Sequence, residues 1–89
     1  MYSNNGVGEV PTRKIPDQFA TRLGARIREK RLDRDISLDA MEGASGISKG
    51  HLSSIEHGKA LINVLTLCKI SKALALEPGE LLAGLAEYL

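Results

Sequence analysis

Apolar side chains recur at helical spacing over most of this chain. Phe19, Leu23 and Ile27 follow one another every four residues, which places them on one face of a helix. The pattern predicts a first helix from about residue 17 to 33. Arg31 is next on the same stripe, an unusual position for a charge.

Polar caps divide the next segment into two short helices. Ser37 and Ser48 are good N-caps, because a serine oxygen can accept a hydrogen bond from a free backbone N–H of the first turn. They predict a second helix that ends at Ser45-Gly46, where a glycine can adopt positive φ, and a third helix of roughly 49–56. A tight turn joins the two.

Two further helices follow. Asn63 caps a fourth helix, and Pro78, which the first helical turn tolerates, opens a fifth. The apolar positions of the two helices are Val64, Leu67, Ile70, Ser71 and Leu74, then Leu81, Leu82, Leu85, Tyr88 and Leu89. With no strand pattern or repeat, the chain is predicted to be an all-α, compact five-helix bundle.

Composition supports this architecture. The 89 residues suffice for one domain, and 43% hydrophobic against 3% aromatic residues requires an aliphatic core. Residues 1–16 hold two glycines, two prolines and no periodicity, which is typical of a disordered arm. We therefore expect a flexible N-terminal arm over 1–16 and a folded domain over 17–89.

Charge leaves the class of partner open. The net charge is +1, but residues 1–35 carry eight basic and five acidic groups, so positive charge gathers towards the N-terminus. We expect Arg26, Arg28, Lys30 and Arg34 to form a solvated face, with a supporting phosphate contact by one of them as the alternative. The single Cys68 is expected to be a small buried hydrophobe in a reducing cytoplasm. Without an apolar run of about 18 residues or a signal-peptide pattern, a soluble cytoplasmic protein is expected.

The segment 36–58 is the most informative part of the chain, with two short helices joined by the turn at 45–48. This run resembles the Cro and phage-repressor type of helix-turn-helix regulators, also called the xenobiotic-response-element family, without gaps from about Leu23 to Leu82. The matching residues are Leu23-Gly24-Ala25-Arg26-Ile27-Arg28, Arg31, Ile36-Ser37, Gly46-Ile47-Ser48, Leu52-Ser53, Ile55-Glu56, Gly58-Lys59, Thr66-Leu67, Lys72-Ala73-Leu74 and Glu80-Leu81-Leu82. The resemblance implies a lambda-repressor-like fold and duplex DNA as the partner.

Carried over by position, the resemblance makes the third helix the recognition helix. Residues at base edges would be Ser48, Lys49, Gly50 and Ser54, and residues at phosphates would be His51, His57 and Lys59. Arg31 and Glu56 would form a partly buried ion pair between the first and third helices. The fifth helix has more leucines than one core face needs. We expect Leu81, Leu82 and Leu85 to supply the core, with Leu85, Tyr88 and Leu89 at a homodimer interface.

The chain departs from the family pattern at several positions. Leu38 replaces a usual polar residue, Glu42 a usual alanine and Ser45 a usual large hydrophobe, and a proline common near Ile62 is absent. These changes imply the loss of a backbone contact to DNA at Leu38 and looser packing of the two helices. Base readout is then expected to be modest, or to depend on DNA shape.

The function predicted is a DNA-binding transcriptional regulator without catalytic residues, cofactor, small-molecule substrate or membrane partner. A metal site at His51, Glu56 and His57 is disfavoured, because positions 51 and 57 do not share a helical face. The alternative is a helix-turn-helix-fold protein-interaction module of the antitoxin or anti-regulator type, with weak DNA binding. A protein partner is compatible with either.

Overall fold

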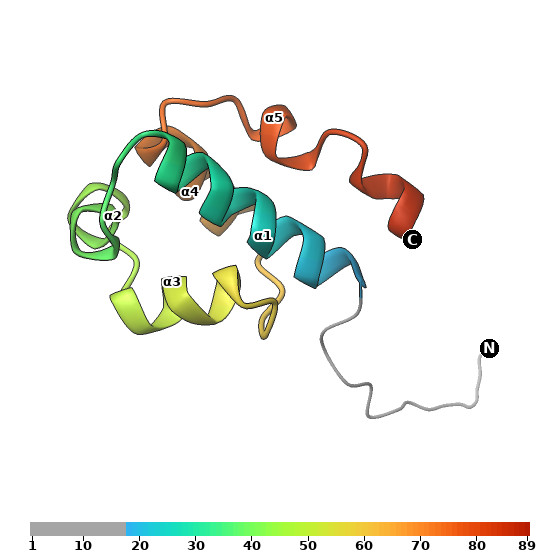
Figure 1. The fold of residues 1–89 in the computed structure, drawn as a ribbon, viewed down its shortest axis with the longest axis horizontal. Helices are drawn as coiled ribbons and strands as arrows, with labels where there is room; N and C mark the ends of the chain where they lie inside the picture. Colours follow the sequence, from blue (N-terminus) through green and yellow to red (C-terminus); the bar gives the residue numbers. More distant parts are fainter. Residues whose placement is uncertain (1–17) are drawn as a thin grey trace.

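The computed structural model describes residues 18–89, which form five α-helices and one 3₁₀ turn (Figure 1). In chain order these are α1 (Gln18–Asp33), α2 (Leu38–Ser45), α3 (Lys49–Glu56), α4 (Val64–Ala73), α5 (Pro78–Leu82) and η1 (Leu85–Tyr88). No strand occurs in this range, so the predicted all-α class and the helix order are confirmed. The predicted arm at 1–16 lies outside the described residues.

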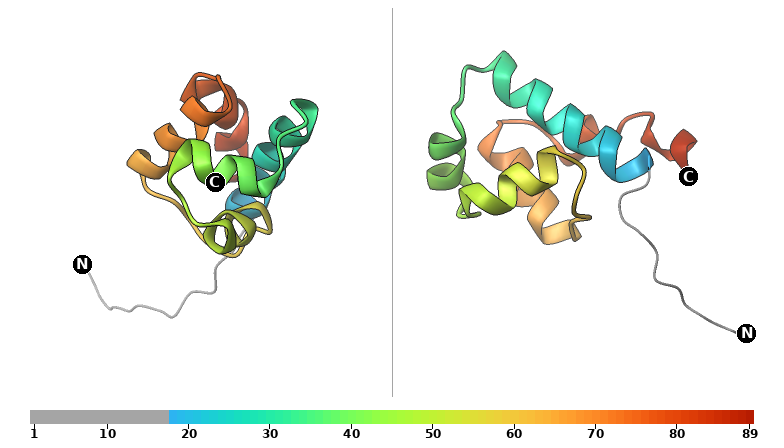
Figure 2. Two further views of the ribbon diagram at one scale, coloured as in Figure 1. Left: turned by 90° about the vertical axis from the view of Figure 1, so that its left-hand side faces the viewer. Right: turned by 60° about the horizontal axis from the view of Figure 1, so that its bottom comes forward.

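α1 is the longest helix of the fold. Figures 1 and 2 show α1 crossing the molecule between α3 on one side and α5 with η1 on the other, and α1 contacts all three. α2 contacts α3 and α4, and α4 contacts α5. The core between them is aliphatic, as the composition requires. Its buried members are Leu23, Ile27, Met41, Ile47, Leu52, Ile55, Leu67, Ile70, Leu74, Leu81 and Leu85.

Side-chain caps set the helix starts. Ser37 Oγ accepts a hydrogen bond from the backbone N–H of Ala40 at 3.0 Å, and Asn63 Oδ1 accepts one from Thr66 at 2.8 Å. Both predicted N-caps are therefore confirmed. At α5 a capping box assists Pro78, since the Glu80 carboxylate accepts from the backbone N–H of Glu77 at 2.9 Å.

The predicted continuous fifth helix is wrong. α5 ends at Leu82, because Ala83 leaves the helical region (ψ 125°) and Gly84 takes a left-handed conformation at φ 77°, after which η1 begins. The break turns Leu81 and Leu85 into the core, at 0% and 2% exposed. It leaves Leu82 at 37% exposed, so its assignment to the core is also wrong.

Four of the five positions predicted to form the apolar row of α4 face the core. The core-facing row is Leu67, Ile70 and Leu74 with Ser71, and this row leaves Val64 75% exposed. Cys68 lies one position off that row and is exposed. The expectation that Cys68 is buried was therefore wrong, because Cys68 lies outside the row that packs on the core.

Candidate nucleic-acid interface

The turn between α2 and α3 is held by one serine and one glycine. Ser45 Oγ donates to the carbonyl of Met41 at 2.7 Å and accepts from the backbone N–H of Ile47 at 3.1 Å. Gly46 follows at φ 76°, and its N–H donates to the carbonyl of Glu42 at 2.9 Å. The serine that departs from the family pattern thus completes the turn with its hydroxyl.

α3 has an inner face and an outer face. Its N-cap Ser48 accepts a hydrogen bond from the backbone N–H of His51 at 3.2 Å. Leu52 and Ile55 are 0% and 1% exposed and anchor the helix to the core. The predicted contact residues lie on the outer side: Lys49, Gly50, His51 and His57 are exposed and Ser54 is half-buried. The structure thus brings these candidates together on one eight-residue helix and its ends.

A buried ion pair ties α3 to α1. Arg31 Nε and Nη2 donate to the two carboxylate oxygens of Glu56, at 2.7 and 3.0 Å, and Nη1 donates to the carbonyl of Ile36 at 2.7 Å. The two side chains are 8% and 3% exposed. The hydrogen bond to Glu56 raises the pKa of Arg31 above its ordinary value, against the opposing effect of desolvation. This bidentate geometry explains a charge on an apolar stripe.

Gly24 allows α1 and α3 to approach closely. A Cβ at this position would overlap the backbone carbonyl oxygen of Ile55 and lie 2.9 Å from that of Glu56. These are rigid backbone atoms, so a side chain at position 24 would push α3 away from α1.

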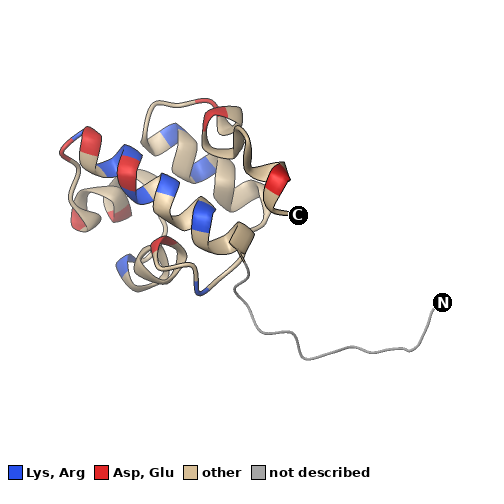
Figure 3. Ribbon diagram, turned by 45° about the vertical axis from the view of Figure 1, so that its right-hand side comes forward, with Lys and Arg blue, Asp and Glu red and all other residues tan. Residues whose placement is uncertain are grey.

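Lys49, the candidate base-reading residue, is already paired. Its Nζ lies 2.9 Å from Oδ1 of Asp39 in the first turn of α2, with both side chains more than half exposed. The hydrogen bond to Asp39 raises the pKa of Lys49, and the negative charge of Glu42 adds to the effect. Figure 3 shows more basic residues on α1 and α4 than on α3. The outer face of α3 is therefore only weakly positive.

The end of α3 carries the candidate phosphate contacts His57 and Lys59. His57 Nδ1 lies 2.7 Å from the carbonyl oxygen of Ser53, which can only accept, so Nδ1 carries the proton and Nε2 is left for an outside partner. Lys59 is exposed and follows the buried Gly58.

The C-terminal segment is bound to α1 more closely than the dimer prediction assumed. Leu85 is 2% exposed in the single chain, and half-buried Tyr88 lies under Arg22, whose guanidinium carbon is 4.7 Å from the ring centre. Of the predicted interface residues, Leu89 alone is broadly exposed, at 88%. Arg26 Nη1 donates to the carbonyls at the end of α5, the shortest being Ala83 at 3.0 Å. Arg26 is half-buried, so besides lying on the basic face of α1 it links α1 to the end of α5.

Residues 18–89 hold neither a metal-binding cluster nor a membrane-spanning helix. No group of three or more His, Cys, Asp or Glu side chains there could hold a metal ion. No helix in that range is long and apolar enough to cross a membrane.

Comparison with known proteins decides the family. A family model described as Helix-turn-helix matches residues 27–81, which is more than half of the chain. The chain belongs to this helix-turn-helix family. The match confirms the resemblance to DNA-binding transcription regulators of the Cro and phage-repressor type.

Relatives of this helix-turn-helix protein are regulators or control proteins. The ImmF control region 10 kDa protein of Bacillus phage phi105 is 38% identical over 50 residues, or 56% of each chain, so the match spans just over half of that relative. The restriction-modification controller C.AhdI from Aeromonas hydrophila superposes with a TM-score of 0.68 at 27% identity, covering 70% of this chain and 94% of its own. The clp gene regulator ClgR from C. glutamicum gives 0.71 at 29% identity, covering 78% and 90%.

Sequence reasoning missed three residues that shape this helix-turn-helix surface. Gly24 carried a signal, because a glycine inside a helical pattern often marks a close approach. The only sequence signal at Ser45 was its departure from the family pattern. Asp39 carried none, because its contact with Lys49 depends on the angle between α2 and α3.

Proposed function

We propose that this protein regulates transcription by binding duplex DNA sequence-specifically as a homodimer on an inverted-repeat operator. The observation that carries the proposal is α3, a capped helix that the core and the Arg31–Glu56 pair hold rigidly, with its polar face outward. A helix presented in this way fits the major groove of B-DNA, which is about 12 Å wide. The gene-control roles that the names of these relatives state agree with this function.

The contacts we propose follow from chemistry and position. Lys49, at the first turn of α3, would leave its ion pair with Asp39 and donate a hydrogen bond to guanine O6 or N7. Gly50 has no side chain and open space around its Cβ position, so the helix backbone can come close to base edges. Ser48 and Ser54 would add hydroxyl contacts to bases.

Phosphates would be met at both ends of α3. The amino end of a helix favours negative charge, and His51 is exposed there. At the carboxyl end, His57 offers its free Nε2 and Lys59 its ammonium group. These contacts would set the register of α3 on the duplex, and base contacts would set specificity.

A two-fold homodimer explains how so small a surface could reach useful affinity. Two α3 helices held about 34 Å apart would enter successive major grooves on one side of the duplex. The operator is then an inverted repeat with half-sites about one helical turn apart. The protein would act where the DNA is, in the cytoplasm, by binding and not by catalysis.

Selection of bound sequences from a random duplex pool tests this function. We expect an inverted repeat, with affinity in anisotropy titrations that falls as salt rises because phosphate contacts release counterions. A pool that yields no preferred sequence, with no binding at low salt, would contradict the proposal. It would favour the alternative, a protein-interaction module, for which the neutralisation of Lys49 by Asp39 is the supporting observation.

A further inference from the structure

The outer face of α4 exposes apolar side chains that no described element covers. Leu61, Val64 and Leu65 are 50%, 75% and 63% exposed, and they make up half of the six large hydrophobic residues exposed among residues 18–89. Residues three and four apart are neighbours on a helix, so Val64 and Leu65 share one side of α4 with the exposed Cys68. The run 60–68 contains no charge. We call Leu61, Val64 and Leu65 the apolar ridge.

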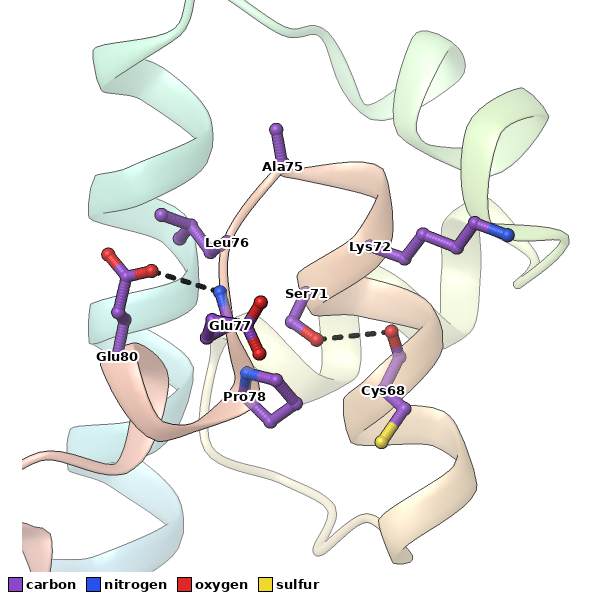
Figure 4. A pocket seen from close by; sticks show the side chains of 8 residues that line it. All are labelled: Cys68, Ser71, Lys72, Ala75, Leu76, Glu77, Pro78 and Glu80. Carbon is purple, nitrogen blue, oxygen red and sulfur yellow. Dashed lines mark hydrogen bonds between the residues drawn. The ribbon is translucent and has the colours of Figure 1, made fainter.

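Beyond Cys68 the same face becomes a groove. An open hollow of about 540 Å³ lies between the end of α4 and the start of α5, and its lining includes Cys68, Ala75, Leu76 and Pro78. Figure 4 shows Cys68 on α4 facing Pro78 across this hollow. Cys68 thus stands at the boundary between the ridge, which precedes it, and the groove, which follows it.

We propose that a second copy of this chain docks on this face, with a two-fold axis beside Cys68. The two α4 helices would run antiparallel, and the ridge of each copy would lie in the groove of the other. The inference rests on the proposed function, which requires a homodimer, and it assigns the surface that forms it. It replaces the C-terminal interface predicted from sequence, whose Leu85 the single chain already buries.

The shape of the face favours a second copy. A two-fold interface uses the same patch on both partners, so it must be complementary to itself. The ridge and the groove lie on opposite sides of Cys68. A two-fold axis beside Cys68 therefore places the ridge of one copy on the groove of the other, which meets this condition. Each contact then occurs twice and removes apolar surface of both copies from water.

The charges at the two ends also favour a second copy. The ridge begins after Lys59, and the groove is lined by Glu77 and Glu80 together with Lys72, which leaves one net negative charge in the groove. Lys59 and Glu77 each lie nine residues from Cys68 along the chain. The antiparallel arrangement therefore brings the basic end of one copy towards the acidic end of the other.

This placement also connects the dimer to DNA binding. The loop that leaves α3 leads directly to Leu61, the first residue of the ridge. A dimer through the ridge therefore holds the two α3 helices at a defined separation, as an inverted-repeat operator demands.

Paired substitutions with sedimentation equilibrium test the surface. Val64→Asp with Leu65→Asp places two carboxylates in the ridge at the amino end of α4, where the helix dipole favours them, so the fold should survive. We expect the dimer dissociation constant to rise roughly 30-fold or more, as for the loss of a central apolar contact. Leu89→Asp is the matched control, because Leu89 is 88% exposed in the C-terminal segment. This variant should leave the dimer dissociation constant unchanged.

Cys68 gives a second readout without any substitution. Its thiol is exposed in the single chain and would be covered in the dimer, so its reaction with a thiol reagent should slow as protein concentration rises. In the ridge variant the reaction rate should not depend on protein concentration.

Three outcomes decide the matter. A dimer that survives in the ridge variant and dissociates in Leu89→Asp overturns the proposed surface. A wild-type protein that stays monomeric in solution and on DNA overturns it as well. A ridge-dependent dimer that binds no duplex supports the surface and contradicts the proposed function, so the two failures can be told apart.

Discussion

Arg31 and Glu56 form a buried ion pair that joins α1 to α3 within an otherwise apolar interface. The bidentate pair, with Ile36 as a third acceptor, satisfies the guanidinium while leaving both side chains under a tenth exposed. Removing one partner leaves the charge of the other buried without a counter-charge. We expect Glu56→Ala to reduce the free energy of unfolding by about 3–5 kcal/mol.

Urea denaturation measures this loss, and a double variant controls for it. Arg31→Met with Glu56→Leu removes both charges and fills similar volume, so it should be more stable than Glu56→Ala. DNA binding by Glu56→Ala should fall only as far as its folded fraction does. Unchanged stability together with lost DNA binding would instead place Glu56 at the DNA surface.

We expect Asp39 to lower the affinity for duplex DNA in general and to increase the preference for the operator over random duplex. It holds Lys49 at 2.9 Å and adds a negative charge beside the candidate DNA surface. Asp39→Asn should therefore raise affinity for random duplex roughly two- to fivefold, as expected for one exposed charge, and reduce the preference for the selected operator. Competition titrations of operator against random duplex measure both effects.

Glu42→Gln is the matched control for Asp39. Glu42 acts on Lys49 through its charge without a hydrogen bond, so its removal should raise non-specific affinity and keep the preference for the operator. If both variants behave alike, Asp39 does not position Lys49.

The helices themselves could be predicted from caps and spacing, but their packing could not. Ser37, Ser48 and Asn63 are local signals, and each caps the helix it was assigned. The break after Leu82 depends on how η1 packs on α1, and the exposed side of α4 depends on where α2 and α5 lie. Such outcomes are set by contacts between distant parts of the chain, which periodicity does not contain.

Gly24 offers a direct test of the α1–α3 approach. Gly24→Ala forces a methyl group against the carbonyls of Ile55 and Glu56, and should destabilise the fold by about 1–3 kcal/mol despite the better helix propensity of alanine. Gly43→Ala is the control, because its Cβ would meet nothing within 4 Å. It should stabilise α2 by up to about 1 kcal/mol. Thermal unfolding that ranks Gly24→Ala at or above wild type would contradict the close packing described.

The site could be predicted only in part. The outer face of α3 follows from the family resemblance and its caps, so Lys49, His51 and His57 could be named from sequence. The partner of Lys49, the hydroxyl network of Ser45 and the anchoring of Tyr88 by Arg22 could not, because each joins residues whose proximity only the folded chain creates.

At the scale of the whole molecule, a small aliphatic core supports one polar helix and one apolar face. α3 points its polar residues outward, and α4 leaves its ridge without a partner in the single chain. The two surfaces adjoin through the loop after α3, so assembly and DNA binding are expected to be coupled. The ridge variant should therefore bind the operator more weakly while keeping its affinity for a single half-site.

The most direct measurement of the central claim is the discrimination between operator and random duplex by Lys49→Ala. If Lys49 reads a guanine, the variant should lose about 1–3 kcal/mol of binding free energy on the selected operator and much less on random duplex. Because Lys49 is exposed, its substitution should leave the fold intact, and thermal unfolding checks this. An equal loss on both duplexes would reduce Lys49 to a phosphate contact, and no loss on either would contradict the account of α3 as the helix that reads DNA.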